Sequence, residues 1–232
     1  MTTPSLAERE RQKRAAAARA IEEIADGMVL GLGSGSTAEF ALEALAKRVA
    51  RGLRIAAIPS SQRTEALARR LGVTLTSFAE HRRIDVTIDG ADEVERGTLN
   101  LIKGLGGALL REKIVAAASA RMIVIVDASK LVARLGTHVP LPVEVASFGW
   151  QTVLDRLSAV GAMPTLRRVG EEPFVTDGGN YIADCAFPAI PDPAALATQL
   201  DGLTGVVESG LFIGLATTVM VGSEAGVDIL ER

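Results

Sequence analysis

The sequence predicts an α/β protein, with a mostly parallel sheet flanked by helices in a Rossmann-like main domain and a smaller inserted α+β domain. Over the first half of the chain, short apolar runs alternate with segments of helical spacing, which is typical of βαβ units. After Gly136 a proline-bearing connection and shorter strand and helix signals follow, and apolar runs return near the end. We therefore expect a main domain of residues 1–136 plus 210–232, and an inserted lid or oligomerisation domain of residues 137–209.

Hydrophobic spacing predicts the elements of the main domain. Alanine-rich, charged sequence predicts a first helix over residues 6–24. A second helix is expected after the turn at residues 33–37, with Ser36 or Thr37 as its N-cap. Strands are expected at residues 28–32, 55–58, near 73–75, 84–88 and 122–126, and further helices through Ala66 and Leu67 and over residues 109–120. Apolar runs at residues 211–215 and 219–221 are expected to return as strands of the same sheet.

Composition argues against several classes of protein. The 232 residues carry a net charge of −3, whereas nucleic-acid binders normally have a strongly basic face. No apolar run approaches the ~20 residues that a membrane helix needs. The charged N-terminal segment lacks the apolar core of a secretory signal. We expect a cytoplasmic protein that binds neither nucleic acid nor membrane.

Cysteine and histidine are too scarce for most metal sites. Cys185 is the only cysteine, so an internal disulfide is excluded, and Cys185 is expected to be a small buried apolar residue. The two histidines, His81 and His138, argue against a zinc site. The sequence predicts no metal and no cofactor.

Four polar or glycine-rich segments follow predicted strands, at residues 33–37, 59–62, 89–93 and 127–130. In open α/β sheets, ligands bind beyond the carboxyl ends of the strands. The agreement of the four segments therefore indicates a ligand site at this edge. Lysine is scarce against arginine in this chain, which makes each retained lysine a candidate for a specific role.

The turn Gly33-Ser34-Gly35-Ser36-Thr37 joins a predicted strand to a helix. Free N–H groups and hydroxyls favour an anion there, although a tight turn with a capping hydroxyl explains the same residues. A dinucleotide fingerprint starting at Gly31 would need glycine at Ser36, and the next strand has no terminal acid. A P-loop would need Gly-Lys before the helix, and a methyltransferase-like loop would usually have an acid at Gly31.

The acidic turn Asp89-Gly90-Ala91-Asp92 places two carboxylates three residues apart. Alone, it is most simply a hydrogen-bonded Asx turn. With Glu93 it could hold magnesium, and in a catalytic role the pair would bind sugar hydroxyls and carry protons.

The run from Lys103 to Lys113 contains three glycines, which let backbone approach a ligand closely. Glu112 is flanked by Arg111 and Lys113, so from the residues alone it is expected on a solvated charged face. Lys103 and Lys13 are equally compatible with surface positions. In Asp127-Ala128-Ser129-Lys130, Asp127 or Ser129 is expected to cap a helix, or Lys130 to face an anion.

Taken together, these segments resemble the ribose-5-phosphate isomerase A family. The matching stretches span almost the whole chain: Gly31-Leu-Gly-Ser-Gly-Ser-Thr-Ala38, Asp89-Gly-Ala-Asp-Glu93, Lys103-Gly-Leu-Gly-Gly-Ala-Leu-Leu-Arg-Glu-Lys113, Asp127-Ala-Ser-Lys130, Leu141-Pro-Val-Glu-Val145 and Thr204-Gly-Val-Val-Glu-Ser-Gly-Leu-Phe212. Two positions depart from the family pattern. Ser34 stands where threonine is frequent, and Leu105 stands where glycine is frequent.

The resemblance implies an enzyme that interconverts ribose 5-phosphate and ribulose 5-phosphate without a cofactor. Glu112 would be the general base, Lys103 would offset charge on the sugar oxygens, and Asp89 would bind hydroxyls and assist ring opening. The other implied substrate contacts are Lys13, Ser34, Gly35, Ser36, Thr37, Gly90, Ala91, Asp92, Gly104, Leu105, Gly106 and Lys130. The resemblance also implies a homodimer, with a tetramer as the alternative.

The implied chemistry needs stabilisation of an enediolate as it forms, which a lysine and backbone N–H groups would supply. Positive surroundings would keep Glu112 ionised and desolvation would act in the opposite direction, and the sequence does not decide between them. The competing classes are a phosphosugar-binding regulator, a sugar-phosphate deaminase and a CoA transferase. No basic helix-turn-helix segment supports the regulator, and the placement of Asp89, Lys103 and Glu112 fits the isomerase better.

Overall fold

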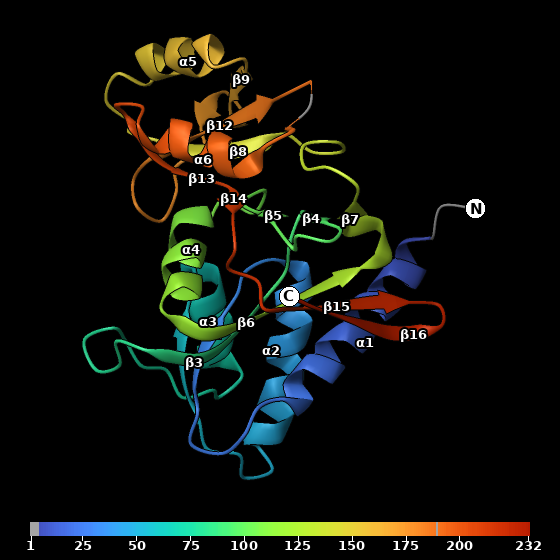
Figure 1. The fold of residues 1–232 in the computed structure, drawn as a ribbon. Helices are drawn as coiled ribbons and strands as arrows, with labels where there is room; N and C mark the ends of the chain where they lie inside the picture. The colour runs from blue at the N-terminus through green and yellow to red at the C-terminus, as the bar shows by residue number, and fades with distance from the viewer. Residues whose placement is uncertain (1–4, 189) are drawn as a thin grey trace. The chain divides into compact units, whose positions relative to one another are not determined.

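A computed structural model describes residues 5–188 and 190–232 (Figure 1). The chain divides into two compact units. Unit 1 comprises Met1–Ala91, Arg111–Leu131 and Leu215–Arg232, and unit 2 comprises Asp92–Leu110 and Val132–Gly214. Residues 92–110, expected in the main domain, thus belong to unit 2. Their strands pair with one another and with residues 211–212, not with the large sheet.

Unit 1 contains a six-stranded sheet in the order β16-β15-β6-β3-β1-β2. All neighbouring pairs are parallel except β15 with β16. The strands are β1 (Val29–Leu32), β2 (Ala56–Pro59), β3 (Ile84–Asp89), β6 (Ser119–Asp127), β15 (Thr218–Ser223) and β16 (Gly226–Glu231). The helices are α1 (Leu6–Glu22), α2 (Ser36–Val49), α3 (Gln62–Arg70), α4 (Leu109–Ala117, which begins at the unit boundary) and the 3-10 turn η1 (Ala128–Lys130).

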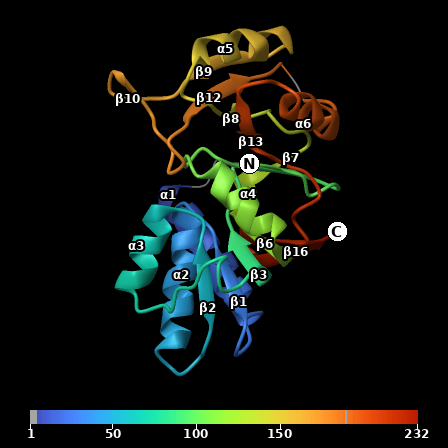
Figure 2. The ribbon, with the colours of Figure 1, turned by 90° about the vertical axis from the view of Figure 1, so that its left-hand side faces the viewer.

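Helices cover both faces of this sheet (Figure 2). Residues of α1, α2 and α3 share one apolar core with Leu30 of β1, Ile88 of β3 and Ile125 of β6. On the other face, Val115 of α4 packs with Ile58 of β2. The sheet is therefore apolar on both sides, as expected for parallel strands joined by helices.

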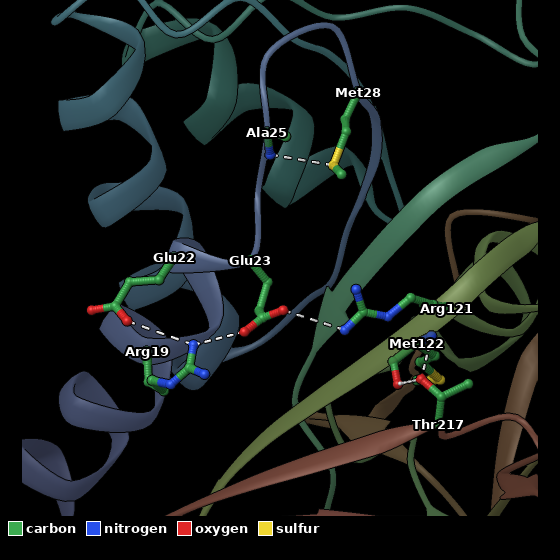
Figure 3. A network of polar contacts seen from close by, with 8 residues as sticks. All are labelled: Arg19, Glu22, Glu23, Ala25, Met28, Arg121, Met122 and Thr217. Carbon is green, nitrogen blue, oxygen red and sulfur yellow. Dashed lines mark hydrogen bonds and ion pairs between the residues drawn. The ribbon is translucent and has the colours of Figure 1, made fainter.

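Helix α1 packs directly on the sheet. A Cβ added to Gly222 of β15 would lie 2.9 Å from Gln12 Cα, so only glycine allows this approach. The C-terminal end of α1 is tied to β6 through Glu23, which accepts from Arg19 (2.8 Å) and Arg121 (3.5 Å) (Figure 3). The hydrogen bond from Arg19 holds the pKa of Glu23 below its ordinary value, although burial acts in the opposite direction.

Unit 2 is built around an antiparallel sheet in the order β13-β8-β12-β9. Strands β5, β4 and β14 form part of a second small sheet, and β10 pairs with β11. The elements are β4 (Glu93–Glu95), β5 (Leu101–Ile102), β7 (Leu131–Val132, which begins at the unit boundary), β8 (Leu141–Val145), α5 (Trp150–Ala159), β9 (Met163–Leu166), β10 (Arg168–Val169), β11 (Glu172–Pro173), β12 (Tyr181–Ala186), α6 (Pro193–Asp201), β13 (Val206–Ser209) and β14 (Leu211–Phe212).

The two faces of β8 have different roles. Leu141, Val143 and Val145 are fully buried in a core that also includes residues of α5, α6 and β12. The alternate residues face the other way. Glu144 is buried and accepts hydrogen bonds from Thr176 and Asn180, both at 2.9 Å. Period-two alternation thus turns Leu141, Val143 and Val145 to one side of β8 and Glu144 to the other.

Most expected elements are confirmed, and three details are wrong. Residues 73–75 contribute only an isolated bridge from Leu75 to Ala57. Residues 211–215 do not return to the large sheet, because β14 pairs with β5 in unit 2. The second helix has Gly35, not Ser36 or Thr37, as its N-cap.

No helix in the described ranges combines the length and the apolar character needed to cross a membrane.

Cys185 is predicted to be unreactive in the folded protein. It is fully buried in the core of unit 2, and burial raises the pKa of its thiol to about 12, with a smaller contribution from Asp184. Because only the thiolate attacks disulfide reagents, the thiol should resist 5,5′-dithiobis(2-nitrobenzoate) at pH 8. We expect labelling only after unfolding in guanidinium chloride. Rapid stoichiometric labelling of the native protein would contradict this placement.

Candidate active site

The turn between β1 and α2 leaves a helix N-terminus without a side-chain cap. Gly35 is the N-cap, with φ of 92°, and no side chain hydrogen-bonds to the cap. The positive φ favours glycine at this position. Because the first backbone N–H groups of a helix have no partner within it, this end suits a bound anion. Ser36 is exposed and Thr37 is buried, so only the first presents its hydroxyl openly to solvent.

Asp89 links this turn to the end of β3. Its buried carboxylate accepts the Ser34 N–H (3.1 Å) and the Gly90 N–H (2.7 Å), both at Oδ1. A Cβ on Gly33 would lie 2.6 Å from Asp89 Cα, so the two chain segments touch. Gly90 in turn lies beside Thr37, with 3.7 Å between a built Cβ and the threonine Cβ. The structure thus brings together the serine–glycine turn and the first half of the acidic turn.

A cluster of hydroxyl groups surrounds Ser34. Its Oγ lies 2.9 Å from Ser60 Oγ, 2.8 Å from Ser61 Oγ and 3.1 Å from Thr64 Oγ1. Thr64 also donates to Gly33 O (3.0 Å), which ties α3 to the turn. Residues 59–62 were predicted at this edge, but Thr64 was missed. Ser61 is the N-cap of α3, and its side chain accepts the Thr64 N–H. A capping serine bonds to a residue two or three positions later, so a cap at Ser61 could have indicated Thr64 from the sequence.

Lys13 reaches the same edge from α1. Its Nζ lies 3.5 Å from Ser36 Oγ and 3.9 Å from the buried carboxylate of Asp127. Asp127 caps η1 by accepting the Ser129 N–H (3.0 Å), as expected. Lys130 ends η1 and is half-buried. The structure therefore gathers a lysine ammonium, a hydroxyl and a helix N-terminus, which together suit a phosphate group.

Glu112 is buried, so the expectation of a solvated charged face is wrong. It lies in the first turn of α4 with 4% of its surface exposed. Its neighbours Arg111 and Lys113 are half-buried, and Ile114 is 49% exposed. The charged neighbours in sequence thus flank a residue that points inward. Charged side chains are seldom buried without a specific function or partner.

The direction of α4 is fixed by its contacts with the sheet. Its C-terminal end leads to the amino edge, where Ala118 O accepts the Ile84 N–H at 3.0 Å. Val115 packs over β1, since a Cβ on Gly31 would lie 2.5 Å from Val115 Cγ1. The same Gly31 site faces Thr87 of β3. The N-terminus of α4 therefore points toward the carboxyl edge.

This direction places Glu112 at the level of the acidic turn. Glu112 precedes Val115 by three residues, a little less than one helical turn and about 4.5 Å along the axis. Gly33 and Asp89 lie two residues beyond the strand positions that Val115 covers, about 6.6 Å along the strands. The carboxylate of Glu112 and the Ser34–Asp89 junction thus belong to the same edge of unit 1.

Unit 2 holds the remaining predicted site residues. Lys103 is buried, its N–H donates to Gly210 O (2.9 Å), and its Nζ lies 5.5 Å from the centre of the Phe212 ring. The Leu105 N–H donates to Asp92 Oδ2 (2.9 Å). Asp92 and the glycine loop of residues 103–107 are therefore joined within unit 2, where Asp92, Lys103, Gly104, Leu105 and Gly106 lie.

Glu93 has a structural role within unit 2. Its buried carboxylate accepts the N–H groups of Gly136 (2.6 Å), His138 (2.6 Å) and Val139 (3.2 Å). The magnesium alternative needed Glu93 as an oxygen ligand beside Asp89 and Asp92. Within residues 5–188 and 190–232, no group of three or more acidic, histidine or cysteine side chains could hold a metal ion.

The fold and the site are those of an α/β protein suited to bind a small anionic ligand beyond the carboxyl ends of its parallel strands. The sequence profile of ribose 5-phosphate isomerase A (phosphoriboisomerase A) matches residues 56–226. This chain belongs to the ribose-5-phosphate isomerase A family.

Relatives and solved structures agree along almost the whole chain. The ribose-5-phosphate isomerase A of Gloeobacter violaceus is 57% identical over 94% of this chain and 95% of its own length. The protein of the same name from Gluconobacter oxydans is 53% identical over 94% and 96%. A solved D-ribose-5-phosphate isomerase in complex with phospho-erythronic acid has a TM-score of 0.93, at 39% identity over 97% of this chain and 99% of its own. That of Methanocaldococcus jannaschii has a TM-score of 0.92, at 38% identity over 96% and 99%.

Gly33→Ala is predicted to destabilise unit 1. The new Cβ would meet backbone at Asp89, so the turn or the strand end must shift. Such overpacking costs roughly 1–3 kcal/mol. We expect a lower free energy of unfolding in urea and a lower Tm than for the unsubstituted protein.

Gly202→Ala is the matched control, because a Cβ there would have its nearest neighbour at an ordinary 3.5 Å. Unchanged stability of Gly33→Ala would contradict the close approach of the two segments.

Proposed function

We propose that this chain interconverts ribose 5-phosphate and ribulose 5-phosphate, with Glu112 as the group that moves the proton. The observation that carries the proposal is the burial of Glu112 at the edge that also holds Asp89 and the serine–glycine turn. A buried carboxylate beside an anion site is the arrangement that proton abstraction next to a carbonyl requires.

The reaction needs one base and a stabilised anion. The Glu112 carboxylate takes the proton from C2 of the open-chain aldose, and the C2 electron pair forms the C1–C2 double bond as negative charge passes to O1. O1 then takes up a proton and O2 loses one, so the negative charge moves from O1 to O2. The Glu112 carboxyl returns its proton to C1 as the C2–O2 double bond forms. Atoms and charge balance without a cofactor. Asp89 binds hydroxyls and assists opening of the sugar ring.

The enediolate is stabilised by cations and N–H groups. Lys103 offsets charge on the sugar oxygens, and the glycine loop adds backbone donors. Lys13, Lys130 and residues 34–37 bind the phosphate, while Gly90, Ala91 and Asp92 contact hydroxyls. The solved relative in complex with phospho-erythronic acid supports this class of ligand, because that molecule is a phosphorylated sugar acid. Its carboxylate carries the kind of negative charge that the enediolate carries.

Glu112→Gln is predicted to lower turnover of ribose 5-phosphate by at least ~100-fold, the scale for a positioned acid–base group. The amide keeps the shape of the side chain but does not accept the proton. Ketose formation gives the rate, and NMR in D2O gives exchange of the C2 hydrogen, which should be lost with it. Substrate binding measured by calorimetry should persist.

The control is Glu224→Gln, which changes an exposed carboxylate in the turn between β15 and β16. It should keep the unsubstituted rate. Near-normal turnover and C2 exchange in Glu112→Gln would remove Glu112 from the mechanism.

We further propose that the chain forms a homodimer through unit 2. Unit 2 exposes large apolar side chains, including Phe148 at 95%, Val169 at 68% and Met163 at 60%. Apolar surface of this kind, where contiguous, marks protein interfaces.

We expect light scattering to give twice the mass of the chain, and Phe148→Asp to shift the mass toward that of the monomer. A monomeric unsubstituted protein at micromolar concentration would contradict the proposal.

A further inference from the structure

Arg167 makes hydrogen bonds through both its backbone and its side chain, and it has no role in the proposed reaction. It lies in unit 2 between β9 and β10, with 14% of its side chain exposed. Its backbone is held on both sides, because its N–H donates to Ile182 O (2.8 Å) and its carbonyl accepts the Phe174 N–H (2.9 Å). The starting point of the side chain is therefore fixed.

The guanidinium joins two partners at once. On one side, Nε donates to Asp184 Oδ2 (2.9 Å) and Nη2 donates to Asp184 Oδ1. On the other side, Nη1 donates to the carbonyl oxygens of Gly104 and Leu105, both at 3.0 Å. The two-pronged pair with Asp184 fixes the plane of the guanidinium as well as its place. The remaining nitrogen is thereby aimed at the glycine loop.

These contacts set the orientation of two peptide groups. In a planar trans peptide, the C=O and the following N–H point in opposite directions, and no cis peptide occurs in the described residues. Since both carbonyls face Arg167, the Leu105 and Gly106 N–H groups face the opposite side. Asp92 lies on that side, because it accepts the Leu105 N–H at 2.9 Å. In the proposed function, Asp92 marks the side on which the substrate lies.

Phe174 makes a second contact with the same loop. A Cβ on Gly107 would lie 2.6 Å from Phe174 Cε1, so the ring packs directly against the glycine. The Arg167 guanidinium carbon lies 5.8 Å from the centre of the Phe174 ring. Arg167 therefore holds Gly104 and Leu105, and Phe174 packs against Gly107 at the other end of the same loop.

We propose that Arg167 is a positioning residue, which turns the glycine loop so that the Gly106 N–H points at a substrate oxygen. Asp184 holds Arg167 in place and balances its charge. The inference rests on the proposed function, in which residues 103–106 contact the substrate. Lysine would not replace Arg167, because an ammonium lacks the planar fork that binds a carboxylate and two carbonyls together.

The test compares Arg167→Ala, Arg167→Lys and Asp184→Asn with Arg168→Ala as control. Arg168 is the adjacent exposed arginine, and its side chain donates to Glu171 O in its own turn. We expect Arg167→Ala to lower kcat/KM for ribose 5-phosphate by about 10- to 100-fold, the scale of a misplaced binding group. Arg167→Lys should recover little, Asp184→Asn should fall between, and Arg168→Ala should match the unsubstituted protein.

Three readouts separate positioning from loss of folding. The pH dependence of kcat should stay unchanged, because Glu112 is untouched. Added guanidinium chloride at low millimolar concentration should restore part of the activity of Arg167→Ala and none of Glu112→Gln. Amide hydrogen exchange at Leu105 and Gly106 should accelerate in Arg167→Ala and not in Arg168→Ala.

Unchanged kcat/KM in Arg167→Ala, or a loss that matches its unfolded fraction, would overturn the inference. An unsubstituted chain without turnover would instead contradict the proposed function, and amide exchange at Leu105 would still decide whether Arg167 holds the loop.

Discussion

The carboxylate of Asp89 joins two turns that follow different strands of one parallel sheet. It accepts N–H groups from Ser34 after β1 and from Gly90 after β3, and it is almost completely buried. Gly33 has no room for a side chain beside it. A buried carboxylate is stable only where donors surround it. The positions of the serine–glycine turn, of the hydroxyl cluster around Ser34 and of the start of α2 all depend on this junction.

Buried charged groups serve two different purposes in this protein. Glu93 and Glu144 each accept hydrogen bonds from residues of one loop. Arg167 does the same for the glycine loop, with a positive charge that suits carbonyl oxygens. Glu112 is buried at the edge where the parallel strands end, and its role in the proposed reaction is chemical. Glu112 is thus assigned to proton transfer, whereas Asp89 both joins two turns and assists opening of the sugar ring in the proposed reaction.

Much of the arrangement of the candidate site was predictable because several motifs lie at strand ends, and strand ends of a parallel sheet share an edge. The alternating pattern gave the main sheet and its helices, although Ser36 was assigned a capping role that Gly35 holds. The exposure of Glu112 was wrongly predicted from its flanking charges. Adjacent helical residues point about 100° apart, so charged neighbours in sequence do not reveal which one faces inward. Pairing of β14 with β5 was also missed, because two-residue strands carry no periodicity.

By itself, the sequence determined the α/β class, the order of the motifs and the family that they resemble. These properties depend on local spacing and on residue type, which are readable along the chain. Only the tertiary structure decided that Glu112 is buried, that Glu93 binds amides, and that residues 92–110 pack with unit 2. It also revealed Arg167, whose partners lie 17 and more than 60 residues away in sequence. Contacts between distant segments depend on how the chain packs, and no local pattern contains that information.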